Sequence, residues 1–168
     1  AWNRVYDITA VPDSQILQFR RVGKGCLSYM AISGKEAAVI DPTMDVNVYM
    51  EEAKARGAKI IAVLDTHTHA DHVSGGSELA GLAHCDYFSP DKEIQIKHTK
   101  LESQIEFGKI KIQVLATPGH TPESVTYLFD NFAFTGDTLF VESVGRPDLV
   151  GQDPHKNASV LWDTLQKL

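Results

Sequence analysis

The chain has 168 residues, 43% hydrophobic and 23% charged, as expected for one globular domain that buries its core without disulfides. The 22 acidic residues outnumber the 16 basic ones, and the formal net charge is −6. This balance disfavours a protein that binds nucleic acid or an anionic membrane, because either partner requires a basic face.

Signals for export or membrane insertion are absent from the sequence. No apolar run approaches the ~20 residues of a membrane span, and residues 1–4 lead into no apolar signal region. Cys26 and Cys85 lie far apart and form no C-x-x-C pair, so we expect no disulfide framework. We therefore expect a cytoplasmic protein, with the mitochondrial matrix as the alternative location.

The first half of the chain predicts buried strands around one helix. The apolar run at residues 37–40 ends at Asp41-Pro42, because proline disfavours continuation. Asp45 can cap a helix whose apolar residues follow at helical spacing, and Gly57 ends that helix. The prediction comprises strands at residues 26–32, 37–40 and 60–64 and a helix at 45–56.

The second half changes to hairpins. Alternating apolar residues predict paired strands at 104–107 and 110–114, and again at 124–129 and 132–134. Residues 158–168 have a helical pattern. Three predicted strands each lead directly into polar residues, and such loops commonly carry chemistry. We expect the three loops to converge.

The first of these loops contains H-x-H-x-D-H, formed by His67, His69, Asp71 and His72. Four strong metal-ligand side chains in six positions are costly to crowd together unless a cation compensates them. The alternative, that they are solvent-facing loop residues, is much less favoured for so dense a pattern. The pattern predicts a metal site.

The other two loops supply one candidate each, His120 after Pro118-Gly119 and Asp137 after Gly136. Each alone would be read as a surface or turn residue, and they gain weight only together with the first loop. Arg146 and Asp148 follow closely. They could hold an anionic substrate or form a structural pair, and the sequence favours neither.

These residues resemble the motifs of the metallo-β-lactamase superfamily. The resemblance is carried by T-H-T-H-A-D-H-V-S-G-G, T-P-G-H-T and T-G-D-T-L-F, and extends over roughly residues 25–148. It implies an α/β (α+β) fold, the four-layer αβ/βα sandwich with metals at the edge between two sheets. The fold hosts several chemistries, so it does not by itself identify the reaction.

Finer motifs are similar to the persulfide dioxygenase branch, especially bacterial enzymes fused to rhodanese domains. They are A-A-V-I-D-P, T-P-G-H-T-P-E-S and G-D-T-L-F-V-E-S-V-G-R-P-D-L. The resemblance implies oxidation of a low-molecular-weight persulfide, such as glutathione persulfide, by O₂ to sulfite and thiol. It assigns one Fe(II) to His67, His120 and Asp137, with Asp71 and His72 as catalytic neighbours. A rhodanese or sulfurtransferase is the implied protein partner.

Two alternatives remain. In a glyoxalase II-like thioester hydrolase, two Zn²⁺ would be held by the same residues together with His69, Asp71 and His72. In the other, the chain is a non-catalytic metal- or thiol-binding domain of a larger assembly. The superfamily pattern also has a later histidine beyond the helix near residue 158, whereas this sequence ends at Leu168. We therefore expect residues 1–168 to be a single, C-terminally incomplete domain of a longer chain, which favours the one-metal centre.

Overall fold

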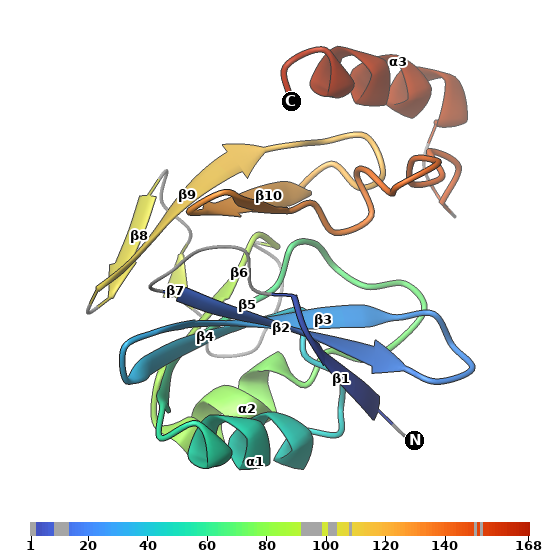
Figure 1. Ribbon diagram of the computed structural model, residues 1–168. Coiled ribbons are helices and arrows are strands. Elements are labelled where there is room, and N and C mark those ends of the chain that lie inside the picture. Colours follow the sequence, from blue (N-terminus) through green and yellow to red (C-terminus); the bar gives the residue numbers. More distant parts are fainter. Residues whose placement is uncertain are drawn as a thin grey trace.

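Two β-sheets pack face to face, with helices on their outer sides (Figure 1). The computed structural model describes residues 3–8, 14–91, 99–100, 104–107, 109–149, 151 and 153–168. The larger sheet contains, in order, β1 (Asn3–Asp7), β2 (Ser14–Arg21), β3 (Leu27–Ser33), β4 (Glu36–Ile40), β5 (Lys59–Leu64), β6 (Asp86–Ser89) and β7 (Thr99–Lys100). The smaller sheet has the order β11 (Phe132–Phe134), β10 (Val125–Phe129), β9 (Ile110–Ala116) and β8 (Gln104–Phe107).

The strand directions bring two functional loops to one edge of the larger sheet. Strands β1 to β4 are antiparallel, whereas β4 to β7 run parallel. Helices α1 (Asn47–Ala55) and α2 (Gly76–Ala83) make the crossovers and cover the same face of the sheet (Figure 1). The loops that leave β4 and β5 therefore start at neighbouring strand ends.

Strands β4 and β5 are buried on both faces, which explains their continuous apolar sequence. Ala38 and Ile40 contribute to the core between the two sheets, whereas Ala37 and Val39 contribute to the core under the helices. In β5, Leu64 and Val63 divide in the same way. The cores on either side of these strands fix the position of the loops that follow them.

The smaller sheet and α3 (Pro154–Leu165) complete the four layers (Figure 1). Strand β9 alternates, with Ile110 and Ile112 buried between the sheets and Lys111 exposed. Helix α3 is fastened to the loop after β9, because the Thr164 hydroxyl donates to the Pro118 carbonyl at 2.7 Å. The α/β sandwich predicted from the sequence is confirmed.

Several local predictions were wrong. Asp45 makes no cap, because α1 begins after Val46 without a side-chain hydrogen bond. Helix α3 starts earlier than expected, at Pro154, where the Asp153 carboxylate accepts from the backbone N–H of His155 and of Lys156. The sequence reading also missed β1, β2, α2, β6 and β7. These five elements lack the long periodic pattern on which the prediction depended.

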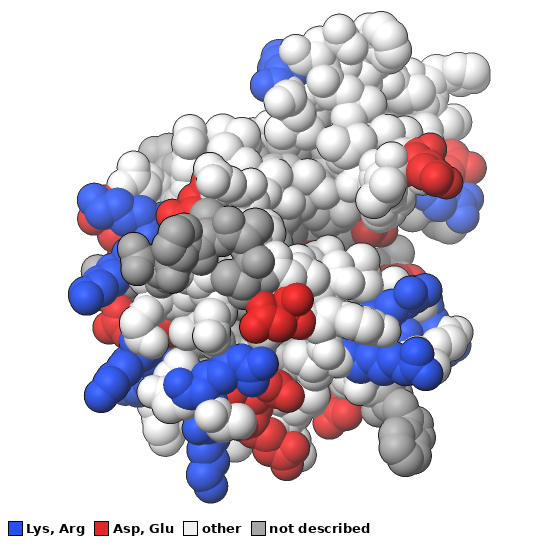
Figure 2. Space-filling model, viewed as in Figure 1, with Lys and Arg blue, Asp and Glu red and all other residues white. Residues whose placement is uncertain are grey.

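The described residues contain no helix long and apolar enough to cross a membrane. On the face shown in Figure 2, acidic and basic side chains are interspersed around the larger sheet and its helices. The region of α3 carries few charges in the same view.

A glycine substitution tests how closely α3 is held. A Cβ at Gly119 would lie 2.5 Å from Leu161 Cα, and the φ of +139° already disfavours a side chain. We expect Gly119→Ala to lower the free energy of unfolding by about 1–3 kcal/mol. The measurement is urea denaturation. Gly81→Ala is the control, since nothing lies within 4 Å there and the helical position should gain up to ~1 kcal/mol. Equal effects of the two changes would contradict close packing of α3 on this loop.

Candidate metal centre

Three loops bring His67, His120 and Asp137 together. They follow β5, β9 and β11, and their donor atoms all lie within 4.8 Å of one another. Asp137 Oδ2 is 3.8 Å from His67 Nε2 and 3.5 Å from His120 Nε2. Both imidazoles are buried, whereas the Asp137 side chain is 44% exposed. The convergence expected from the sequence is present.

Hydrogen bonds fix which ring nitrogens face the carboxylate as acceptors. The Thr66 hydroxyl donates to Asp41 Oδ2, so its oxygen is left to accept a proton from His67 Nδ1 at 2.9 Å. His120 Nδ1 lies 2.9 Å from the Arg146 carbonyl, which can only accept. Both Nδ1 atoms therefore carry the proton in the neutral rings, and both Nε2 lone pairs point toward an anionic oxygen. Metal-binding histidines are commonly oriented in this way.

Gly145 allows the backbone to close over this cluster. A Cβ at this position would lie 1.8 Å from the Asp137 carbonyl oxygen and 3.0 Å from His120 Cγ. No side chain fits there. The glycine thus keeps the loop after β11 in contact with both ligands.

Beneath the cluster lies a buried acidic layer that the sequence reading missed. Asp41 accepts from the backbone N–H and the hydroxyl of Thr66 at 2.7 and 2.9 Å, and its Oδ1 lies 3.3 Å from His69 Nε2. Asp65 accepts from Ser74 and Tyr87 hydroxyls, and its own carbonyl accepts from Tyr127 at 2.6 Å. Both aspartates end a buried strand, which was the only signal available in the sequence.

Burial and neighbouring charges set the protonation of this layer. Burial, with the charge of Asp41, raises the pKa of Asp65 to about 6. Burial acts to raise the pKa of Asp41 as well, but the adjacent His69 holds it below its ordinary value. Burial lowers the pKa of His67, which keeps this ring neutral. A neutral imidazole is the form that can bind a metal.

Asp71 and His72 form a separate group near the surface. Asp71 Oδ1 lies 2.9 Å from His72 Nδ1, and Asp71 Oδ2 is 3.5 Å from Cys26 Sγ. The neighbouring His72 lowers the pKa of Asp71 although burial opposes this, whereas burial and Asp71 raise the pKa of the Cys26 thiol. The contact with Cys26 bridges 45 residues of sequence and could not be read from the chain.

Arg146 and Asp148 are paired with each other on the surface. Arg146 Nε and Nη2 donate to the two carboxylate oxygens of Asp148 at 2.8 and 3.1 Å. The structural pair considered in the sequence reading is therefore present. The Arg146 backbone has a second role, because its carbonyl holds the His120 ring.

The donor set fits a metal ion. Asp137 Oδ2 faces the two Nε2 atoms at 3.5 and 3.8 Å, and all three donor atoms lie within 4.8 Å of one another, which is a spacing that one ion with bonds of about 2.1 Å can bridge. Nε2 of His72 is also buried and lacks a hydrogen-bond partner among the described residues, whereas Nε2 of His69 is ion-paired with Asp41. Buried imidazole nitrogens without partners are costly, and a nearby cation would satisfy them.

A family model described as the metallo-beta-lactamase superfamily matches residues 21–168. The chain belongs to this superfamily. In a metallo-beta-lactamase fold, the grouped histidines and aspartates indicate a metal cofactor and an enzyme.

Curated relatives of different activities match the chain about equally well. A probable polyketide biosynthesis zinc-dependent hydrolase, PksB, of Bacillus subtilis is 30% identical over 85% of this chain and 65% of its own length. A hydroxyacylglutathione hydrolase of Anaeromyxobacter dehalogenans is 32% identical over 91% and 61%. The mitochondrial persulfide dioxygenase ETHE1 of Bos taurus is 31% identical over 68% and 47%. The chain thus spans about half to two thirds of these relatives.

Solved structures agree on the fold. A metallo-beta-lactamase from Staphylococcus aureus superposes with a TM-score of 0.86 at 26% identity, covering 93% of this chain and 53% of the other. ETHE1 from Myxococcus xanthus gives a TM-score of 0.80 at 28% identity, covering 90% and 68%. The structural comparison therefore supports the family and does not distinguish between the reactions.

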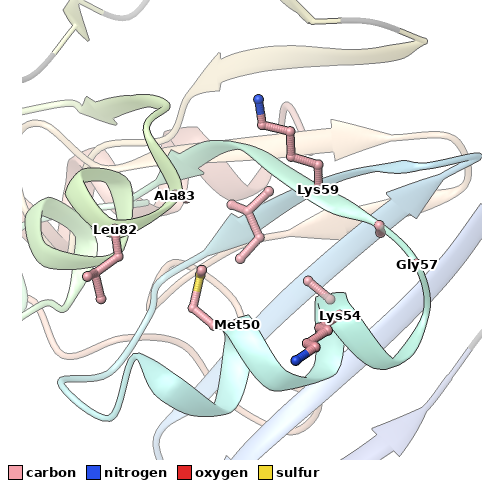
Figure 3. Close-up of a pocket in the computed structure, with 9 residues that line it drawn as sticks. Met50, Lys54, Gly57, Lys59, Leu82 and Ala83 are labelled. Atoms are coloured by element: carbon pink, nitrogen blue, oxygen red, sulfur yellow. The ribbon is translucent and has the colours of Figure 1, made fainter.

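A pocket of about 380 Å³ lies away from this centre (Figure 3). Met50 and Lys54 of α1, Gly57, Lys59 at the start of β5 and Leu82 of α2 line it. The metal-binding loop leaves the opposite end of β5, and six strand residues span about 20 Å. This pocket is remote from the chemistry.

The pair of His69 and Asp41 predicts a pH dependence of stability in the metal-free chain. Burial alone lowers the pKa of His69, but Asp41 overrides this effect and the pKa rises from 6.5 to about 9. The pair therefore stabilises the fold fully below about pH 6.5, and this stabilisation is lost as the pH rises through about 9. We expect the free energy of unfolding to fall by the order of 2 kcal/mol across this window.

Urea denaturation in a metal chelator measures this fall. His69→Gln keeps a polar side chain but cannot titrate, so the decline across this window should be absent. An unchanged decline in His69→Gln would show that other groups cause it.

Proposed function

We propose that the protein is a persulfide dioxygenase that uses one Fe(II) held by His67, His120 and Asp137. The observation that carries this proposal is the separation of the donor groups. The three proposed ligands form one set, His69 is paired with Asp41, and Asp71 and His72 face each other and Cys26. Two histidines and one carboxylate on one face of an ion are typical of non-haem iron oxygenases.

The chain's own residues prepare this centre. Iron, when bound, would mediate the transfer of electrons from the outer sulfur of the persulfide to O₂, so that this sulfur takes both oxygen atoms and, with one water, leaves as sulfite and the free thiol. Thr66 and the Arg146 carbonyl hold the two imidazoles with Nε2 available. Asp71 fixes the ring of His72 through Nδ1, which leaves Nε2 of His72 to orient water or substrate at the centre.

Arg146 is proposed to bind a carboxylate of the thiol carrier, such as glutathione. Its guanidinium is exposed and held by Asp148, which leaves part of its donor fork open to solvent. Because its carbonyl contacts His120, an anion bound at this loop would sit close to the metal-binding side chains.

A second candidate is thioester hydrolysis with two Zn²⁺. The unpartnered Nε2 atom of His72 favours it, since His72 would be a ligand of such a centre together with His69. Relatives described as hydroxyacylglutathione hydrolases match the chain as well as those described as persulfide dioxygenases. In this case His69 would leave Asp41 to bind the first zinc.

Replacing the carboxylate ligand tests the proposal directly. Asp137→Ala should remove bound iron and lower O₂ uptake with glutathione persulfide by more than about 100-fold, since even residues that only orient ligands contribute 10–100-fold. Iron analysis and an oxygen electrode provide the measurements. Uptake that survives in this variant would refute the iron assignment.

His69→Gln separates the two candidates. As a dioxygenase, the variant should retain one iron per chain and turn over within about tenfold of the parent, because His69 is no ligand. As a hydrolase, it should lose zinc and hydrolysis of a hydroxyacylglutathione thioester. Metal analysis with both substrates reports the outcome. Iron lost together with O₂ uptake in His69→Gln would contradict the three-ligand centre.

A further inference from the structure

The pocket between α1, α2 and the start of β5 has the size and lining of a ligand site (Figure 3). Its volume is about 380 Å³. Pockets that bind small molecules commonly measure about 300–1,000 Å³, so this one suits a small ligand. None of the described residues that line it belongs to the metal cluster or to the loops that supply that cluster.

Small residues keep this pocket open where two helices and a strand meet. Ala53, Ala58 and Ala83 each present only a methyl group to it. Gly57 adds no side chain, and its φ of +64° favours glycine at this position. The space therefore follows from the sequence, because a larger side chain at any of the three alanines would narrow it.

The walls of the pocket are mostly apolar and reach from the core to solvent. Ile60 is buried in the core under the helices, whereas Leu82 is 50% exposed. Met50 is partly buried against the same core, and a methionine side chain adapts readily to an apolar guest. A hydrocarbon group bound here would remove apolar surface from water, which is favourable.

Two lysines give the pocket a positive charge. Lys54 lies in the last turn of α1, and Lys59 is the first residue of β5. Their side chains point in different directions (Figure 3). No carboxylate is among the described residues that line the pocket, and no described carboxylate forms an ion pair with either ammonium group. The charge at the pocket therefore favours an anion.

The end of α1 does not need these ammonium groups as hydrogen-bond donors. Lysines near a helix C-terminus often bond the last carbonyls. In α1 the backbone N–H of Gly57 donates to the Lys54 carbonyl at 3.1 Å, and that of Ala58 donates to the Ala53 carbonyl at 2.9 Å. Because backbone donors already satisfy these carbonyls, the lysines remain available to a ligand.

We infer that this pocket binds a small amphipathic anion, namely a carboxylate on a short hydrocarbon chain. The hydrocarbon occupies the space beside the alanines, and the carboxylate pairs with Lys54 or Lys59. An exposed ion pair contributes only about 0.2–1 kcal/mol, so apolar contact supplies most of the affinity and the lysines select the sign of the charge. The inference goes beyond the proposed dioxygenase and requires no metal, because the two helices and β5 form the whole site.

Hexanoate is the probe, with 1-hexanol and hexylammonium as neutral and cationic analogues of the same chain length. Each is titrated at pH 7 into the metal-free 168-residue chain, and binding is followed by ¹⁵N NMR. Hexanoate should shift the signals of residues 50–60 and 82–83. It should bind about threefold more tightly than 1-hexanol, and hexylammonium should bind more weakly than either.

A double charge variant tests the role of the lysines. Lys54→Gln with Lys59→Gln should remove the preference for hexanoate and retain the binding of 1-hexanol. Lys109→Gln with Lys111→Gln is the matched control, because it makes the same change in net charge on the smaller sheet. The control should keep the preference.

Filling the pocket tests its location. Ala83→Leu should abolish the shifts caused by hexanoate and by 1-hexanol while the rest of the spectrum stays folded. Shifts that are absent from the parent or lie outside the pocket, equal affinity for hexanoate and hexylammonium, or full binding by folded Ala83→Leu would overturn the inference. If that variant does not fold, the lysine variants decide the question.

Discussion

The structure depends on one electrostatic constraint, which is that two imidazole lone pairs and a carboxylate face one another with no proton between them. His67 and His120 have committed their Nδ1 protons to a threonine hydroxyl and a backbone carbonyl, so only Nε2 acceptors face Asp137. Acceptors at this spacing repel one another, and both rings are buried. A cation turns the repulsion into coordination. The fold can therefore hold these loops in place most stably when the ion is bound.

Hydrogen bonds between polar residues at the ends of buried strands hold the metal-binding side chains in this arrangement. Asp41, which follows β4, holds the backbone and side chain of Thr66, and Thr66 in turn holds His67. Tyr127 reaches across from the smaller sheet to the Asp65 carbonyl. The two sheets are thus linked by hydrogen bonds beneath the metal cluster, where an apolar core alone would leave the loops free to move.

The sequence predicted the elements and loops that have a local pattern. It did not predict contacts between residues that are far apart in the chain. The apolar runs of β4 and β5, and the alternation in β9, predicted those strands, and the dense H-x-H-x-D-H pattern predicted the first loop. The sandwich itself was implied only by the resemblance of the loop motifs to a known superfamily. The polar alternation of β2 and the short α2 carry no comparable signal, because burial against neighbouring elements decides their structure. In the sequence, Asp41 appears only as the end of a strand, and Cys26 only as a cysteine without a C-x-x-C partner. Their partners are 25 and 45 residues away.

The same contacts decide how readily a second ion could join the first. The first set needs no rearrangement, since its acceptor atoms already face one another. Recruiting His69 would separate it from Asp41, which is only 5% exposed and lies beside Asp65. Two buried carboxylates would then keep only hydroxyl and backbone donors, unless the incoming ion stays close enough to offset their repulsion. The centre at His67, His120 and Asp137 should consequently fill first.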